Sequence, residues 1–277
     1  MMYKVILILL FIFFVINIFY FIEEKSFSKR VETIFSSLFC SFVLFFAANK
    51  IKNFWICFVI GIIYLLLISL SKFFLYHKYA YGIHRDVKKL KRLKFLTFQK
   101  LFCLLISPDY YITYYFKNLL EPYGEDRRAK LVKSYNYENM LITFIFILLN
   151  YILYIINIKF EIIYFITLYR ILSRTYEIIA SFVIDVVDGN KKKSTLTFSD
   201  RIGLAFLSIA EVIGLQIAKY LLIDNSDSFS QRLLKAFYNV FSLNFEMLSL
   251  TDFLCYISVF SLLGIVITSY ISTKTEK

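Results

Sequence analysis

A row of charged and hydroxyl side chains runs along the apolar segment 162–187. On a helical wheel, at about 100° per residue, these side chains fall within a sector of about 80°, and the opposite face is apolar. The row consists of Arg170, Arg174, Glu177, Ser181, Asp185 and Asp188. An ionised side chain that faces lipid costs at least about 2.5 kcal/mol, so the row must face protein, water or a partner. The sequence leaves two arrangements open, a buried row and a helix lying at the membrane surface, and we favour the buried row.

The next apolar segment, 198–223, carries a single carboxylate, Glu211, near its middle. Ser199 or Asp200 is expected to cap this helix. A lone carboxylate at that depth must be protonated or paired, and we expect its partner to be Arg170 or Arg174 of the preceding helix. Two roles remain open, an ion pair that fixes helix packing and a group that takes part in ion or proton passage. The predicted buried charge network comprises Arg170, Arg174, Glu177, Arg201 and Glu211.

The sequence offers little for other chemistry. It contains no GxxxxGK[ST], GxSxG or HExxH motif. The four cysteines stand singly in apolar runs and no Cys/His pair occurs, so neither a metal site nor a disulfide framework is indicated. Four carboxylates, which we expect to be solvated turn residues, surround Pro122 and Gly124: Asp109, Glu121, Glu125 and Asp126. The alternative for these four carboxylates is an acidic site beside the membrane, but we expect no enzyme, no metal and no cofactor.

The composition explains why so few polar residues are present. Of the 277 residues, 59% are hydrophobic and 20% are aromatic, and the mean hydropathy is +0.67. Soluble domains are about 45–50% apolar, so a chain this apolar could not cover its surface with polar groups. In a membrane protein, a formal charge of +12 indicates the orientation of the spans and contact with anionic lipid, and it does not indicate nucleic-acid binding. The composition predicts an all-α integral membrane protein.

A helix that crosses a membrane needs about 20 mainly apolar residues, and about seven segments are candidates. They are Tyr3–Ile22, Thr33–Ala48, Phe54–Leu75, Met140–Ile156, Ile162–Val187, Phe198–Ile223 and Phe253–Ile271. The excess of Lys and Arg between the third and fourth segments places that stretch in the cytoplasm. Alternation then puts the N-terminus outside and the C-terminus inside. We expect a multi-pass protein of the cell membrane.

The segment from Lys72 to Lys133 is strongly basic. Its residues 84–100 mix Lys and Arg with leucines, and Pro108 and an aromatic stretch follow. This combination is typical of an element at the membrane surface. It predicts either a simple anchored linker or a site for anionic lipid or a cytosolic partner.

The C-terminal part contains a short apolar helix, predicted over Arg232–Asn244, which is too short to cross a membrane. Residues 242–252 then lead directly into the last span. This order of elements, with the run Lys235–Ser242 placed before a last helix that contains Gly264, resembles the two-helix pore module of potassium-channel-like proteins. The resemblance covers residues 200–275 and implies a re-entrant pore helix and a homo-oligomer, a tetramer by analogy with that family. The residues that it places at the pore are Ser242, Asn244, Glu246 and Ser249.

Two functional hypotheses from different classes follow. The first is a cation-conducting oligomeric pore formed by the C-terminal helices. The second is a non-transporting membrane component, such as an immunity or defence-associated protein or an anchor for a cytosolic partner. The predicted regions are 1–76, three membrane helices; 77–137, the basic segment; 138–197, two membrane helices with the polar row; and 198–277, the pore-like module.

Overall fold

The computed structural model describes residues 54–80, 107–120, 123–157, 161–188, 195–223, 227–242 and 249–275. Within these ranges the regular structure is helical and no strand occurs, so the all-α prediction is confirmed for this part of the chain. The helices are α3 (Phe54–Ala80), α6 (Pro108–Leu120), α7 (Glu125–Ile156), α8 (Glu161–Asp188), α9 (Phe198–Leu222), α10 (Phe229–Phe241) and α11 (Leu250–Thr275). The spans predicted at Tyr3–Ile22 and Thr33–Ala48 lie outside the described residues.

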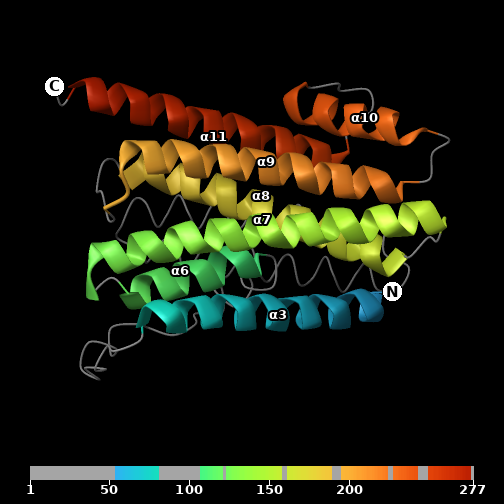
Figure 1. Ribbon diagram of the computed structural model, residues 1–277, viewed down its shortest axis with the longest axis horizontal. Coiled ribbons are helices and arrows are strands. Elements are labelled where there is room, and N and C mark those ends of the chain that lie inside the picture. The colour runs from blue at the N-terminus through green and yellow to red at the C-terminus, as the bar shows by residue number, and fades with distance from the viewer. Residues whose placement is uncertain are drawn as a thin grey trace, which may run out of the picture.

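The long helices lie side by side along the long axis of the molecule (Figure 1). Helix α8 is central, because it contacts α3 and α6 as well as α9 and α11. Helix α7 packs along α9, and the short α10 packs against α9 and α11. As a result, every residue in 170–180 except Leu172 is buried. The polar row predicted on this segment therefore begins at the centre of the bundle.

Most predicted helices agree with the structure within a few residues, and two of them begin earlier than predicted. Helix α7 begins at Glu125, well before the predicted Met140, so the predicted boundary between residues 137 and 138 falls inside it. Helix α10 begins at Phe229 and not at Arg232, because Ser228 and Gln231 form a capping box that starts the helix earlier. Thr197, with Asp200 as its partner, caps α9, which corrects the predicted caps Ser199 and Asp200.

Helix α6 differs from the sequence-based expectation. The aromatic stretch after Pro108 was expected at the membrane surface, yet α6 packs against α3, α7 and α8. Its buried side chains include Tyr110, Ile112 and Leu120, and Leu120 joins an apolar cluster with Tyr76 and Tyr135. Burial of these side chains outweighs the amphipathic character that suggested a surface position.

Two of the described helices, α7 and α9, are long and apolar enough to cross a membrane. The most apolar stretch of α7 is only 22% buried inside the bundle, whereas that of α9 is 56% buried. Most large apolar side chains in the apolar stretch of α7 therefore point away from the protein interior, although Leu153 is buried.

Candidate functional site

The guanidinium of Arg170 lies at the centre of the bundle and is fully buried. Its Nη1 donates to Asp109 Oδ1 on α6 at 2.5 Å and to the Tyr64 hydroxyl on α3 at 2.9 Å. Its Nη2 donates to Asn139 Oδ1 on α7 at 3.1 Å and to Glu211 Oε1 on α9 at 3.2 Å. One side chain of α8 thus bonds to four neighbouring helices.

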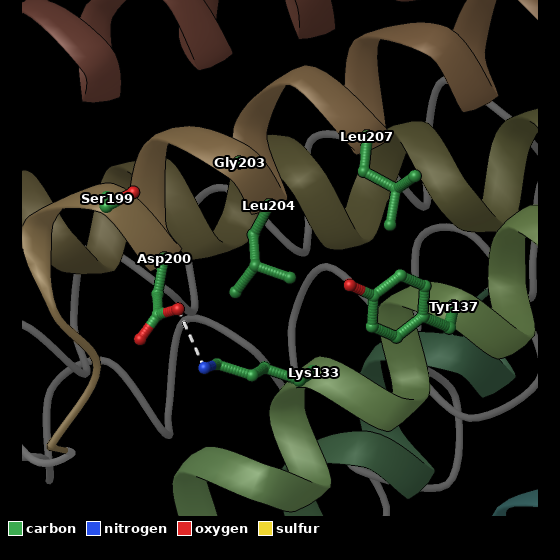
Figure 2. A pocket seen from close by; sticks show the side chains of 7 residues that line it. All are labelled: Lys133, Tyr137, Ser199, Asp200, Gly203, Leu204 and Leu207. Carbon is green, nitrogen blue, oxygen red and sulfur yellow. Dashed lines mark ion pairs between the residues drawn. The ribbon is translucent and has the colours of Figure 1, made fainter.

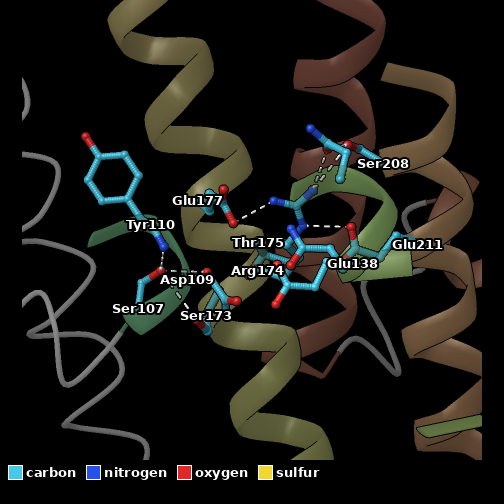
Figure 3. Close-up of polar contacts among 12 residues, drawn as sticks. Ser107, Asp109, Tyr110, Glu138, Ser173, Arg174, Thr175, Glu177, Ser208 and Glu211 are labelled. Atoms are coloured by element: carbon cyan, nitrogen blue, oxygen red, sulfur yellow. Dashed lines mark hydrogen bonds and ion pairs between the residues drawn. The ribbon is translucent and has the colours of Figure 1, made fainter. Parts of the chain in front are cut away.

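Arg174, one turn later on α8, binds the second oxygen of the same carboxylate. Its Nε donates to Glu211 Oε2 at 2.7 Å, and its Nη1 lies 2.6 Å from Glu177 Oε2. Its Nη2 completes the shell with bonds to Asn136 Oδ1 and Ser208 Oγ, both at 3.3 Å. Glu211 therefore bridges the two arginines, and Figure 3 shows its carboxylate beside Arg174. The sequence left the partner open between Arg170 and Arg174, and in the structure Glu211 pairs with both.

A buried lysine extends this network towards α3. The Lys72 Nζ donates to Asn139 Oδ1 at 3.0 Å and lies 3.4 Å from Glu138 Oε2. Ser71 donates to the other oxygen of Glu138. Asn139 accepts from both Lys72 and Arg170, so it joins the two parts of the network. Three cations and four carboxylates share this buried region, which we call the central ion network: Lys72, Arg170, Arg174, Asp109, Glu138, Glu177 and Glu211.

Two members of the central ion network correct sequence-based expectations. Asp109 was expected to be a solvated turn residue, yet it is fully buried because α6 docks its first turn against α8. Its Oδ2 accepts from Ser173 Oγ at 2.6 Å (Figure 3). Lys72 was counted in the basic segment expected at the membrane surface, but its burial and its pairing with Glu138 remove it from that surface.

Other predicted members lie elsewhere. Arg201 is half-buried in the first turn of α9, and among the described residues no hydrogen bond or ion pair joins its side chain to the central ion network. It stands about 15 Å along the helix axis from Glu211, beyond the reach of that carboxylate. Ser181 is half-buried, and the side chains of Asp185 and Asp188 lie outside the described part of the chain.

A second buried ion pair connects α9 with the start of α11. The Lys219 Nζ lies 2.6 Å from Asp252 Oδ1, and both side chains are almost fully buried. Ser249, which the sequence placed at a pore, is exposed and caps α11: its Oγ accepts from the Asp252 N–H at 3.3 Å. Ser242 ends α10 and donates from its Oγ to the Tyr238 carbonyl oxygen at 2.7 Å. The other two predicted pore residues, Asn244 and Glu246, lie outside the described residues.

A shallow pocket of about 200 Å³ lies between the first part of α7 and the start of α9 (Figure 2). The Lys133 Nζ and Asp200 Oδ1 pair across it at 2.7 Å, and both side chains are partly exposed. Leu204 and Leu207 form its apolar side, while Tyr137 and Gly203 complete the lining together with Ser199. The pocket is separate from the central ion network.

These arrangements limit the chemistry. No group of three or more His, Cys, Asp or Glu side chains that could hold a metal ion occurs among the described residues. The carboxylates of the central ion network are bound to arginine, lysine, serine or tyrosine, which favours charge compensation over acid–base catalysis. No family model matches the chain, and no curated protein or solved structure is significantly similar to it.

Proposed function

We propose that this chain is a multi-pass protein of the cell membrane. The support is an apolar exterior around a charged centre. Large apolar side chains are exposed along the outer faces of two helices, Ile63, Leu66, Leu67, Leu70 and Phe74 on α3 and Leu141, Phe144, Ile145, Leu148, Ile152 and Ile155 on α7. Lipid requires this distribution, because polar groups must be satisfied inside the protein. The apolar segments of the sequence predict about seven spans, and the distribution of Lys and Arg predicts an outer N-terminus and a cytoplasmic basic segment.

For its activity, the proposal is an oligomeric pore for cations formed by the C-terminal helices. The observation that carries it is α10, a helix of 13 residues placed between the long helices α9 and α11. At about 20 Å, α10 is too short to cross a bilayer. Its Ala236 and Val240 are buried, whereas Leu234, Phe237, Tyr238 and Phe241 are exposed. This apolar outer face suits contact with lipid or with another copy of the chain.

Arg232 secures α10 in this position. Its Nη1 donates to the carbonyl oxygens of Tyr220, Leu221 and Ile223, the last at 2.8 Å. These carbonyls belong to the C-terminal end of α9, where backbone acceptors have no partner within the helix. The guanidinium also lies over the ring of Tyr154 on α7, 4.7 Å from its centre. A helix anchored in this way is a suitable support for a pore segment over residues 242–249.

Planar-bilayer recording of the purified protein tests the pore. Glu246 is the only ionised side chain between Ser242 and Ser249, and a ring of carboxylates attracts cations and excludes anions. We expect reversal potentials in a salt gradient to show cation preference, which Glu246→Lys abolishes or inverts. Glu125→Lys is the matched control, because Glu125 is exposed at the start of α7 and outside the module. Absence of current from wild-type protein in several lipid mixtures would contradict the pore.

The second candidate function is a non-transporting membrane component. It is favoured by the central ion network, in which each of the seven charged groups has an ionic partner within the chain. A network whose charges are all paired within the chain suits a structural role better than passage of ions. The mass of the protein in detergent separates the two functions: a monomer without current supports the non-transporting component, and an oligomer with current supports the pore.

A further inference from the structure

The ammonium of Lys219 is held by oxygen atoms on several sides. Its Nζ lies 2.6 Å from Asp252 Oδ1 and 3.0 Å from the hydroxyl oxygens of Ser249 and Thr251. The ring of Tyr220 lies below it, with the Nζ 4.8 Å from the ring centre. All three oxygen atoms accept from this ammonium and come from the N-cap and first turn of α11, so the start of one helix surrounds the cation of another.

Oxygen atoms of this type also bind free metal cations. Hard cations take carboxylate and hydroxyl oxygens, and monovalent cations in membrane proteins are held by rings of oxygen atoms. A lysine ammonium is a compact point charge, unlike the wide and planar guanidinium of arginine. It can therefore occupy the position that an alkali-metal ion of similar size would take.

We call the oxygen atoms of Ser249, Thr251 and Asp252 around this ammonium the cage. A further buried polar side chain of α9 contacts one of these three residues. Gln216, one turn earlier on α9, is fully buried, and its Nε2 donates to the Thr251 carbonyl oxygen at 3.3 Å. Its Oε1 has no hydrogen-bond donor among the described residues. A buried carbonyl oxygen without a donor costs free energy, and a cation can act as the partner of such an oxygen.

We propose that Ser249, Thr251 and Asp252 form a binding site for a monovalent cation, which Lys219 fills with its own ammonium. The folded protein needs one positive charge at this position, and the chain supplies it from α9. Binding of a free cation and occupation by Lys219 exclude each other. Ser249 is exposed and gives the site a route to solvent, whereas Lys219 and Asp252 are buried. The site concerns binding alone and does not depend on conduction through the protein.

Removal of the lysine side chain tests the proposal. In Lys219→Ala, the thermal midpoint of the full-length protein in detergent should rise by about 2–4 °C when potassium chloride replaces N-methylglucamine chloride at equal ionic strength. Ethylammonium chloride, which restores the missing ammonium, should give a similar rise. Wild type should show no such response, because its site is already filled.

Two further variants keep the test decisive. Lys219→Ser adds a hydroxyl to the cage and should show the same potassium response if the alanine variant does not accumulate. Lys219→Ala combined with Asp252→Asn should lose the response, because the only carboxylate of the site is neutralised. Equal midpoints in potassium and N-methylglucamine for both single variants would overturn the proposal. A response of the same size in wild type would overturn it as well.

Discussion

Glu211 accepts from both arginines of α8, so its loss should disturb both of these ion pairs of the central ion network. Removing one partner of a buried ion pair leaves an uncompensated charge, which costs about 3–5 kcal/mol. We predict that Glu211→Gln lowers the free energy of unfolding by this amount, measured by thermal or denaturant unfolding in detergent. Adding Arg174→Gln together with Glu177→Gln removes one cation left without that carboxylate and also its remaining carboxylate partner, and should recover part of the loss. Equal stability of the single and triple variants would contradict the pairing.

Asp109 provides a test with a well-matched control. Asp109→Asn keeps the shape of the side chain but removes the charge that faces Arg170 at 2.5 Å. We predict a loss of about 3 kcal/mol or more, because Arg170 is fully buried. Asp126→Asn makes the same change at an exposed position in the first turn of α7 and should alter stability by less than about 0.5 kcal/mol. Similar unfolding midpoints for the two variants would show that Asp109 carries no such role.

The central ion network could be predicted in part from the sequence. Arg170, Arg174 and Glu177 share one helix face, and Glu211 interrupts an apolar run, so spacing alone brought them together. Asp109 could not be found in this way, because its burial depends on how α6 docks against α8, and Asp beside Pro is typical of a turn. Lys72 did carry a signal: it is the only charged residue in the apolar stretch from Phe54 to Leu75.

At the scale of the helices, local signals near the ends decided the boundaries. The sequence from Ser228 to Gln231 has the spacing of a capping box, and this signal would have placed the start of α10 correctly. The start of α7 had no comparable signal, because Gly124 makes no side-chain cap. Its charged first half was assigned to the basic segment, although the helix continues without a break into the apolar half.

The crossing of α7 and α9 depends on the absence of a side chain at Gly214. A Cβ atom there would lie 2.8 Å from Thr143 Cγ2 and 3.1 Å from Ile147 Cδ1. We predict that Gly214→Ala destabilises the protein by about 1–3 kcal/mol, because the packed helices must separate. Thr143→Ser removes the methyl group at the closest contact and should reduce this loss in the double variant.

Gly203 on the same helix is the control for this crossing. A Cβ atom at Gly203 would meet no atom within 4 Å. Gly203→Ala should therefore be neutral or stabilise α9 by about 0.5–1 kcal/mol through helix propensity. Unfolding midpoints of the two alanine variants should move in opposite directions or differ clearly, and equal midpoints would contradict the role of the close crossing.

At the scale of the whole molecule, composition predicted the helical class because 59% hydrophobic residues leave few alternatives. The order in which the helices pack could not be predicted, because apolar helices of similar composition can exchange neighbours at little cost. Contacts that distinguish one neighbour from another are polar, as between Asn150 on α7 and the Ala218 carbonyl on α9. Only the folded arrangement shows which polar groups meet.

We propose that lipid-facing helices cross the membrane and enclose a charged centre. Single cysteines introduced at Lys88 and at Asn225, in a protein whose native cysteines are replaced, test this topology. The charge pattern places the first position in the cytoplasm and the second outside. With a membrane-impermeant maleimide, intact cells should label the cysteine at 225 at once and the cysteine at 88 only after permeabilisation. Labelling of both positions in intact cells, or the reverse pattern, would contradict the proposed topology.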